Sequence, residues 1–278
     1  MDYGIMSYVT ESSMMPQELA VEVEGRGFES LFFPEHTHIP AVRISRYPLA
    51  EEMPISNAHS LDPFVAISAA VVATKELKLG TGICLIVERD PIITAKAIAS
   101  LDYLSRGRII VGVGAGWNRE EMRNHGTDPR HRIMLLGERV RAMKTIWAND
   151  EATFQGKYVM FDRIWSWPKP VQRPSPPVMI GGNGPSVIDR VLSYGDGWFP
   201  NDFADLRALA ARIRDLHQRG VEGDRGWLPV TAFGAASDEP SLRALSRLGF
   251  DRVVFSVRSG DRADVIPELD RIALMCGL

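Results

Sequence analysis

The feature that most constrains the fold is an alternation of short β-forming runs with longer segments of helical periodicity. This alternation predicts parallel strands joined by crossover helices. Eight strand-and-helix units can be counted, and no composition shift or internal repeat divides them. We therefore expect one domain over residues 1–278, a closed (β/α)₈ barrel of the TIM type, in preference to an open doubly wound sheet.

Glycine, proline and aspartate mark the limits of these units, since Asp-Pro pairs start helices and glycines end them. The predicted strands are about 3–9, 30–33, 77–85, 108–113, 178–181, 197–200, 227–233 and 252–257. The predicted helices are 16–25, 63–75, 91–106, 131–148, a helix from Pro185, 203–219, 238–248 and 262–275.

Two insertions interrupt the regular units. The first is a proline-containing loop over 35–61, after the second strand. The second spans about 150–176, before the fifth strand, and combines a small hairpin at 152–161 with a proline-rich connector at 163–177. Long loops on a barrel are usually lids or pocket walls, so we expect both insertions to shape a pocket.

Composition narrows the function classes. With 32 Lys and Arg against 35 Asp and Glu, the net charge is −3, so nucleic acid is not an expected partner. Only Cys84 and Cys276 are present, which fits a reducing compartment. No apolar run approaches the length of about eighteen residues that a membrane helix needs, and the first residues lack a signal-peptide pattern. We expect a cytoplasmic protein without membrane association.

In a barrel of this type the site lies where strands lead into helices. After the second strand the sequence reads Phe33-Pro-Glu-His-Thr-His38, which makes Glu35 and His36 candidates for proton transfer. A rival interpretation takes the His-x-His pair as zinc ligands of a metal-dependent hydrolase. That interpretation lacks ligands on later strands, because the only histidine past His131 is His217, within a predicted helix. No metal site is predicted.

Glycines in the third and fourth strands mark places where a ligand can approach the backbone. Gly82 lies inside the third strand, and the fourth strand runs into Gly112-Val-Gly-Ala-Gly116-Trp-Asn118. Its G-x-G-x-G spacing and its place in the fourth unit separate it from the dinucleotide-binding fingerprint. A bulge at Gly82 and a crowded turn with Trp117 in the core are the structural alternatives to a ligand site.

The best single signal is Val178-Met-Ile-Gly-Gly-Asn-Gly184-Pro-Ser186. Three glycines between an apolar strand and a helix start expose backbone N–H groups at a helix N-terminus, where the dipole favours an anion. This pattern predicts a phosphate site, and the alternative is a tight loop that needs positive φ.

Taken together, several segments resemble the luciferase-like monooxygenase family, in the expected order and over nearly the whole chain. They are Phe33–His36, Leu79–Ile83, Asp90-Pro91, Asp102–Arg108, Val111–Asn118 and Ile180–Gly184. The resemblance is closer to members that use the deazaflavin coenzyme F420 than to the two-chain luciferases.

The resemblance implies a role for each matched position. Glu35 and His36 are expected beside the reactive ring as catalytic residues, and the Gly82–Ile83 peptide is expected to be cis and to bulge toward that ring. The other expected coenzyme contacts are Ala115, Gly116, Trp117 and Asn118 beside the ring, and Gly181, Gly182, Asn183 and Gly184 at the phosphate. A carboxylate that related sugar-phosphate dehydrogenases carry at the position of Trp117 is absent, which argues against that substrate.

The expected reaction is hydride transfer between F420 and a small organic substrate under the 36–60 loop. Arg43, Arg46 and Lys169 are candidate contacts for the polyglutamate tail of that coenzyme. The nearest alternative is an FMN-dependent monooxygenase that uses O₂ and receives reduced flavin from a reductase partner. A non-catalytic coenzyme-binding barrel is a third. Relatives are often homodimers, and Trp165 and Trp167 are candidate interface residues.

Overall fold

A computed structural model describes residues 1–48 and 50–278 as a barrel of parallel strands. Its eight-stranded sheet has the order β8-β7-β4-β3-β2-β1-β10-β9. A parallel bridge between Trp198 and Val230 joins the two edge strands and closes the barrel. The strands are β1 (Asp2–Met6), β2 (Ser30–Phe33), β3 (Lys78–Cys84), β4 (Ile109–Val113), β7 (Val178–Gly181), β8 (Gly197–Phe199), β9 (Thr231–Ala235) and β10 (Arg252–Ser256). The predicted fold class is confirmed.

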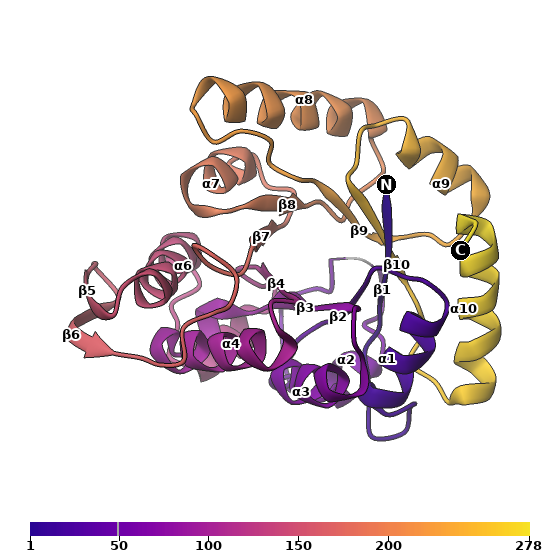
Figure 1. Ribbon diagram of the computed structural model, residues 1–278, viewed down its shortest axis with the longest axis horizontal. Helices are drawn as coiled ribbons and strands as arrows, with labels where there is room; N and C mark the ends of the chain where they lie inside the picture. Colours follow the sequence, from indigo (N-terminus) through magenta and orange to yellow (C-terminus); the bar gives the residue numbers. More distant parts are fainter. Residues whose placement is uncertain (49) are drawn as a thin grey trace.

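Helices surround the strands, as the ring of coiled ribbons in Figure 1 shows. The main ones are α1 (Pro16–Gly25), α3 (Pro63–Ala73), α4 (Pro91–Ser105), α6 (Arg132–Ala148), α7 (Val187–Tyr194), α8 (Leu206–Glu222), α9 (Glu239–Ser246) and α10 (Arg262–Cys276). Three short helical segments, α2 (Ser56–His59), η1 (Ile86–Glu88) and α5 (Arg119–Asn124), lie in the connections after β2, β3 and β4. None of these three was predicted.

Local signals set the helix ends where the sequence predicts them. The Asp62 carboxylate accepts hydrogen bonds from the N–H groups of Phe64 and Val65, and Asp90 caps α4 in the same way. Each aspartate satisfies donors that the first helical turn leaves free, and the proline after it has no donor to lose.

Several predicted boundaries are wrong by three or four residues, because the first strand ends at Met6, α8 spans Leu206–Glu222 and the hairpin reaches Trp165. Two further errors have a clear local cause. The seventh strand begins at Thr231 and not at Trp227, because Pro229 has no N–H and the N–H of Val230 binds the Asp251 carboxylate at 2.7 Å. Helix α7 begins at Val187 and not at Pro185, since Pro185 and Ser186 form a turn in which Val187 N–H donates to Gly184 O.

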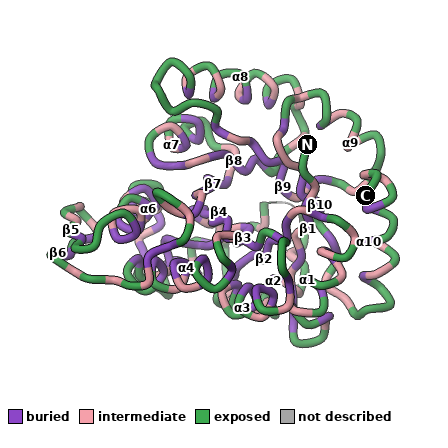
Figure 2. Tube along the Cα trace, viewed as in Figure 1, coloured by how far each residue is buried: buried purple, intermediate pink, exposed green. Residues whose placement is uncertain are grey.

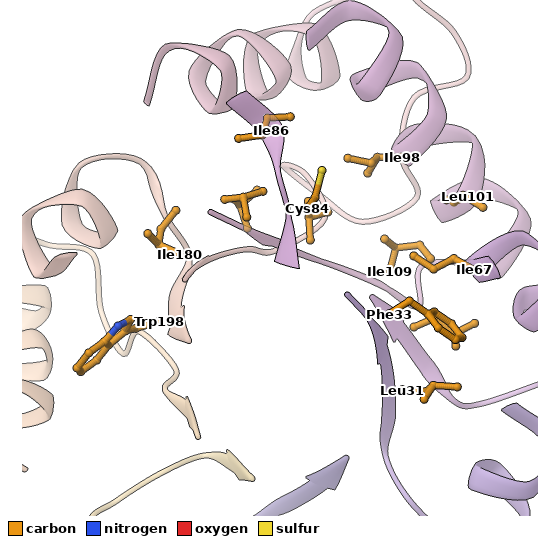
Figure 3. Packing of buried hydrophobic residues seen from close by; sticks show 14 of the residues in the cluster. Leu31, Phe33, Ile67, Cys84, Ile86, Ile98, Leu101, Ile109, Ile180 and Trp198 are labelled. Carbon is orange, nitrogen blue, oxygen red and sulfur yellow. The ribbon is translucent and has the colours of Figure 1, made fainter. Parts of the chain in front are cut away.

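The core lies between the strands and the helices, where buried segments gather in the interior and exposed ones on the outer helix faces (Figure 2). Side chains from β2, β3 and β4 meet residues of α3 and α4 there, and Figure 3 shows Phe33 and Ile109 close to Ile67 of α3. Close packing of this kind fixes the strand ends that carry the candidate site. Within the described residues no helix is both long and apolar enough to span a bilayer.

The 150–176 excursion lies away from the pocket, contrary to the prediction. Its hairpin, β5 (Glu151–Gln155) and β6 (Met160–Trp165), lies outside α6 in Figure 1. Its turn is held by Glu138 of α6, which accepts from the N–H groups of residues 157–159. The connector then passes the C-terminal end of α4, where Asp102 accepts from Val171 N–H at 2.7 Å. A segment that leaves the end of α6 starts at the amino-terminal end of the barrel.

Candidate functional site

Three phenylalanines close the barrel lumen below the carboxyl ends of the strands. The rings of Phe32, Phe199 and Phe233 pack with centroids 4.9–5.5 Å apart. Glycines make room for them, because a Cβ at Gly82 would lie 2.1 Å from the Phe233 ring. Any ligand must therefore sit above this aromatic layer.

Ile83 lies above that layer and forms the floor of the barrel mouth, the cavity end of the strands. Register between β3 and β4 shifts between Thr81 and Cys84, and the Gly82–Ile83 peptide bond is cis. A Cβ at Gly114 would lie 1.9 Å from Ile83 Cδ1, and one at Gly181 would lie 3.1 Å from its Cγ2. Glycine at both positions lets Ile83 lie across the mouth as a flat apolar surface.

His36 is buried at the end of β2 and is held by a carboxylate that the sequence did not single out. Its Nδ1 lies 2.8 Å from Glu121 Oε2, and Thr37 N–H donates to the other Glu121 oxygen at 3.2 Å. An ionised Glu121 can only accept, so Nδ1 carries the proton of this bond. His36 is left with Nε2 to exchange a proton with a ligand.

Glu35 lies beside His36 but has both carboxylate oxygens bound. One oxygen accepts from Leu85 N–H at 2.6 Å and the other pairs with the Arg89 guanidinium. Arg89 also pairs with Asp62 and lies 4.7 Å from the Phe64 ring. Glu35 thus ties the ends of β2 and β3 together, and the predicted proton transfer by Glu35 has no free oxygen to support it.

Glu88 is a third buried carboxyl, in η1. Neither of its oxygens has a hydrogen-bond partner among the described residues, and His125 Nε2 lies 4.0 Å from Glu88 Oε2. Burial, together with Glu121 and Glu35, raises the pKa of Glu88 to about 9. Glu88 is therefore protonated at neutral pH.

We expect Glu88→Gln to flatten the pH dependence of stability. The pKa of Glu88 is about 9 in the folded protein and 4.5 in the unfolded chain. The contribution of protonated Glu88 to the free energy of unfolding is therefore fully present below pH 4.5. This stabilisation is lost as the pH rises toward 9, and the free energy of unfolding falls by up to about 1.4 kcal/mol per pH unit. Urea unfolding at pH 5, 7 and 9 measures this, with exposed Glu52→Gln as the control. If the free energy of unfolding declined equally with pH in wild type and in Glu88→Gln, this prediction would be contradicted.

Aromatic residues wall the mouth on the side of His36. The Trp117 ring lies 5.7 Å from the His36 ring and 5.6 Å from that of Tyr47. Tyr8, just past β1, is close enough that Tyr47 and Glu121 add to burial in raising the pKa of its hydroxyl. Tyr8 was not predicted as a site residue, because the first predicted strand, 3–9, includes it, whereas β1 ends at Met6 in the structure.

The side-chain amide of Asn118 has a donor that no described residue accepts from. Its side-chain oxygen caps α5 by accepting from Glu121 N–H at 3.3 Å. Its Nδ2 is buried and unpartnered among the described residues. A buried amide donor costs free energy unless a ligand or water accepts its hydrogen bond, so Asn118 fits the coenzyme-contact position predicted for it. The turn before it includes buried Ala115 and Gly116 at φ +68°.

The loop after β7 presents backbone N–H groups and has its carbonyls turned away. Arg212 donates to the carbonyls of Asn183 and Gly184 at 2.9 and 2.7 Å, and Trp198 Nε1 donates to that of Gly182 at 2.8 Å. Gly182 has φ +111°, a conformation that favours glycine. The N–H groups of Asn183 and Gly184 make no hydrogen bond to a described residue.

Two arginines add positive charge to this loop. Arg190 Nη2 lies 3.9 Å from a Cβ built on Gly184, and its Nε is buried without a partner among the described residues. Burial and then the charge of Arg190 lower the pKa of Arg212, so the two guanidinium groups are neighbours. Free N–H donors beside two arginines are groups that can bind a phosphate. Neither arginine was predicted.

The residues predicted to contact the polyglutamate tail of F420 lie at two different places in the structure. Arg43 and Arg46 are exposed on the 36–60 loop beside the mouth. The prediction for Lys169 is wrong, because its Nζ is directed to the carbonyls of Ile146 and Asn149 at 2.7 and 2.5 Å. Those carbonyls end α6 at the opposite end of the barrel.

The described residues do not bring together the ligands that the zinc interpretation requires. His36 Nδ1 is bound to Glu121, and His38 Nδ1 lies 3.0 Å from Thr37 Oγ1. Across residues 1–48 and 50–278, no three His, Cys, Asp or Glu side chains are arranged to hold a metal ion.

Comparison with known proteins places this geometry in context. A family model described as luciferase-like monooxygenase matches residues 15–246. An uncharacterized protein of Mycobacterium tuberculosis is 34% identical over 279 residues, which covers 98% of both chains. The FMNH₂-dependent dimethylsulfone monooxygenase of Pseudomonas putida is 33% identical over 189 residues, 65% of this chain and 51% of that one.

Among solved structures, an F420-dependent secondary alcohol dehydrogenase in complex with an F420-acetone adduct superimposes with a TM-score of 0.76. The alignment covers 99% of this chain and 98% of that one at 20% sequence identity. At that identity, the likeness concerns the fold.

Proposed function

The chain belongs to the luciferase-like monooxygenase family, and on this basis we propose that it is an oxidoreductase that uses coenzyme F420. Its reaction is the transfer of a hydride between that coenzyme and a small organic substrate. The loop at Gly181–Gly184 carries the coenzyme part of this proposal, because its free N–H groups and the two arginines fit a phosphate beside an apolar floor. The choice of F420 over FMN rests on the sequence resemblance to members that use F420. When bound, the deazaflavin ring would supply the carbon that gives or accepts the hydride.

The residues of the chain position the reactants and exclude water. Ile83 and the phenylalanine layer beneath it give a flat ring an apolar surface. Asn118 Nδ2 offers that ring a hydrogen bond, and the Trp117 ring closes the side next to His36. Fixing both reactants in a water-poor cavity lowers the entropic cost of reaching the transition state.

His36 handles the proton that accompanies hydride transfer. Glu121 fixes the imidazole through Nδ1, so Nε2 is the atom that takes a proton from an alcohol-type substrate or returns one to a carbonyl. Glu121 acts through His36 and is a positioning residue.

A second candidate is an FMN-dependent monooxygenase that uses reduced flavin and O₂. The Pseudomonas relative supports it, and the phosphate loop would hold FMN equally well. This function needs a reductase partner to supply the reduced flavin. A non-catalytic coenzyme-binding barrel is the third interpretation, and bound coenzyme that keeps its redox state across a broad substrate panel would favour it. A homodimer also remains a prediction, and both Trp165 and Trp167 are exposed.

Titration of the coenzyme-free protein with F420 and with FMN tests the proposal. We expect F420 to bind at least about tenfold more tightly, a difference of about 1.4 kcal/mol. Fluorescence of each coenzyme gives both dissociation constants under identical conditions. Tighter binding of FMN would replace the first candidate with the second, and binding of neither would overturn both.

A further inference from the structure

A cavity of about 700 Å³ lies beside the mouth, between α5 and the start of α6. Four arginines line it, Arg119, Arg123, Arg130 and Arg132, and Asp128 is the one acidic residue among its lining. The whole chain has a net charge of −3, so this concentration of positive charge is a local feature.

Two of the four arginines pair with a carboxylate, whereas Arg119 and Arg132 have no acidic partner among the described residues. Asp128 pairs with Arg130 at 2.6 Å, and Arg123 lies 3.7 Å from Glu120. Arg132 donates to the Pro129 carbonyl, which carries no net charge. The side chains of Arg123 and Arg130 are 60% and 84% exposed, so both can turn toward a ligand.

The start of α6 adds to the positive potential. Arg132 is its first residue, and its N-cap, His131, makes no side-chain hydrogen bond to the free N–H groups of the first turn. A helix of this length carries a partial positive charge at its N-terminus. The cavity therefore combines guanidinium groups with a helix end, both of which favour anions.

The cavity is connected to the candidate site through α5. Arg119 directly follows Trp117 and Asn118, which border the mouth, and its N–H donates to Ser45 Oγ of the 36–60 loop. Arg123 lies one helical turn further from the mouth. A molecule bound above Ile83 can thus extend past Trp117 along the arginines.

We propose that this cavity binds a polyanionic extension of a molecule held in the mouth, with carboxylates or phosphates spaced along the arginines. The inference rests on the proposed function for what occupies the mouth. Two sources share this chemistry: an acidic group of the substrate, and the glutamate tail of the deazaflavin coenzyme.

Isothermal titration with sodium tripolyphosphate tests the site without either ligand. We expect Arg119→Gln combined with Arg123→Gln to weaken tripolyphosphate binding at least tenfold. Arg130→Gln combined with Arg132→Gln should do the same, which guards against misfolding of one variant. The control is Arg207→Gln combined with Arg214→Gln, which removes equal charge from exposed positions of α8. Absence of binding by wild type, or an equal loss in the control, would overturn the proposal.

Coenzyme titrations then identify the source. If F420 with its glutamates binds wild type more tightly than the tailless form, and the α5 variant removes that difference, the cavity holds the coenzyme tail. If both forms bind wild type equally while tripolyphosphate binding depends on the arginines, the anion belongs to the substrate. Failure of both forms to bind would reject the proposed function and leave the tripolyphosphate result unaffected.

Discussion

His36→Ala is expected to lower turnover by a factor of about 10² to 10⁴ and to leave coenzyme affinity nearly unchanged. The imidazole is buried, its Nδ1 is held by Glu121 at 2.8 Å, and its ring contacts Trp117 at the edge of the mouth. Removing it takes away the proton-transfer group but none of the contacts proposed for the phosphate. Steady-state kinetics with a substrate found by panel screening, together with coenzyme titration, separates the two effects.

Two further variants sharpen this test. Glu121→Gln keeps the shape of the side chain but removes the negative charge that holds the imidazole, so turnover should fall less than in His36→Ala and its pH profile should shift. His38→Ala is the matched control, since His38 contacts Thr37 and Asn124 and makes no hydrogen bond to Glu121. Equal losses in His36→Ala and His38→Ala, or unchanged turnover in His36→Ala, would remove His36 from the mechanism.

The second large effect concerns the loop after β7. Arg190→Gln and Arg212→Gln should each weaken coenzyme binding by about ten- to a hundredfold, because a hydrogen bond to a charged group contributes about 1.5–3 kcal/mol. Arg212 also holds the carbonyls of Asn183 and Gly184 away from the mouth, so its loss lets acceptor atoms turn toward the phosphate.

The control for this prediction is a ligand and not a variant. A coenzyme analogue that lacks the phosphate, such as riboflavin or the deazaflavin chromophore alone, should bind wild type and both variants with similar affinity. A loss of the same size for the phosphate-free analogue would mean that the arginines stabilise the loop without contacting phosphate.

The barrel could be predicted because its signals are local. Strand periodicity, the Asp-Pro caps at Asp62 and Asp90 and the glycines at helix ends each depend on a few neighbouring residues. The position of the 150–176 excursion was mistaken, although chain order contained the answer: a segment between a helix and the next strand lies at the amino-terminal end of a barrel.

The candidate site could be predicted only in part, because several of its side chains depend on contacts between distant segments. Glu121 lies in α5, which was not predicted, and its contact with His36 spans 85 positions. Arg212 lies 28 residues beyond Gly184, and no spacing rule connects them. Glu88 is buried by the packing of η1, which no periodicity indicates.

The most direct test of the central claim is a crystal structure of the protein with F420 bound. We predict phosphate oxygens within hydrogen-bond distance of the N–H groups of Asn183 and Gly184, and the ring stacked over Ile83 with His36 at its edge. A phosphate bound away from this loop, or a ring outside the mouth of the barrel, would contradict the account.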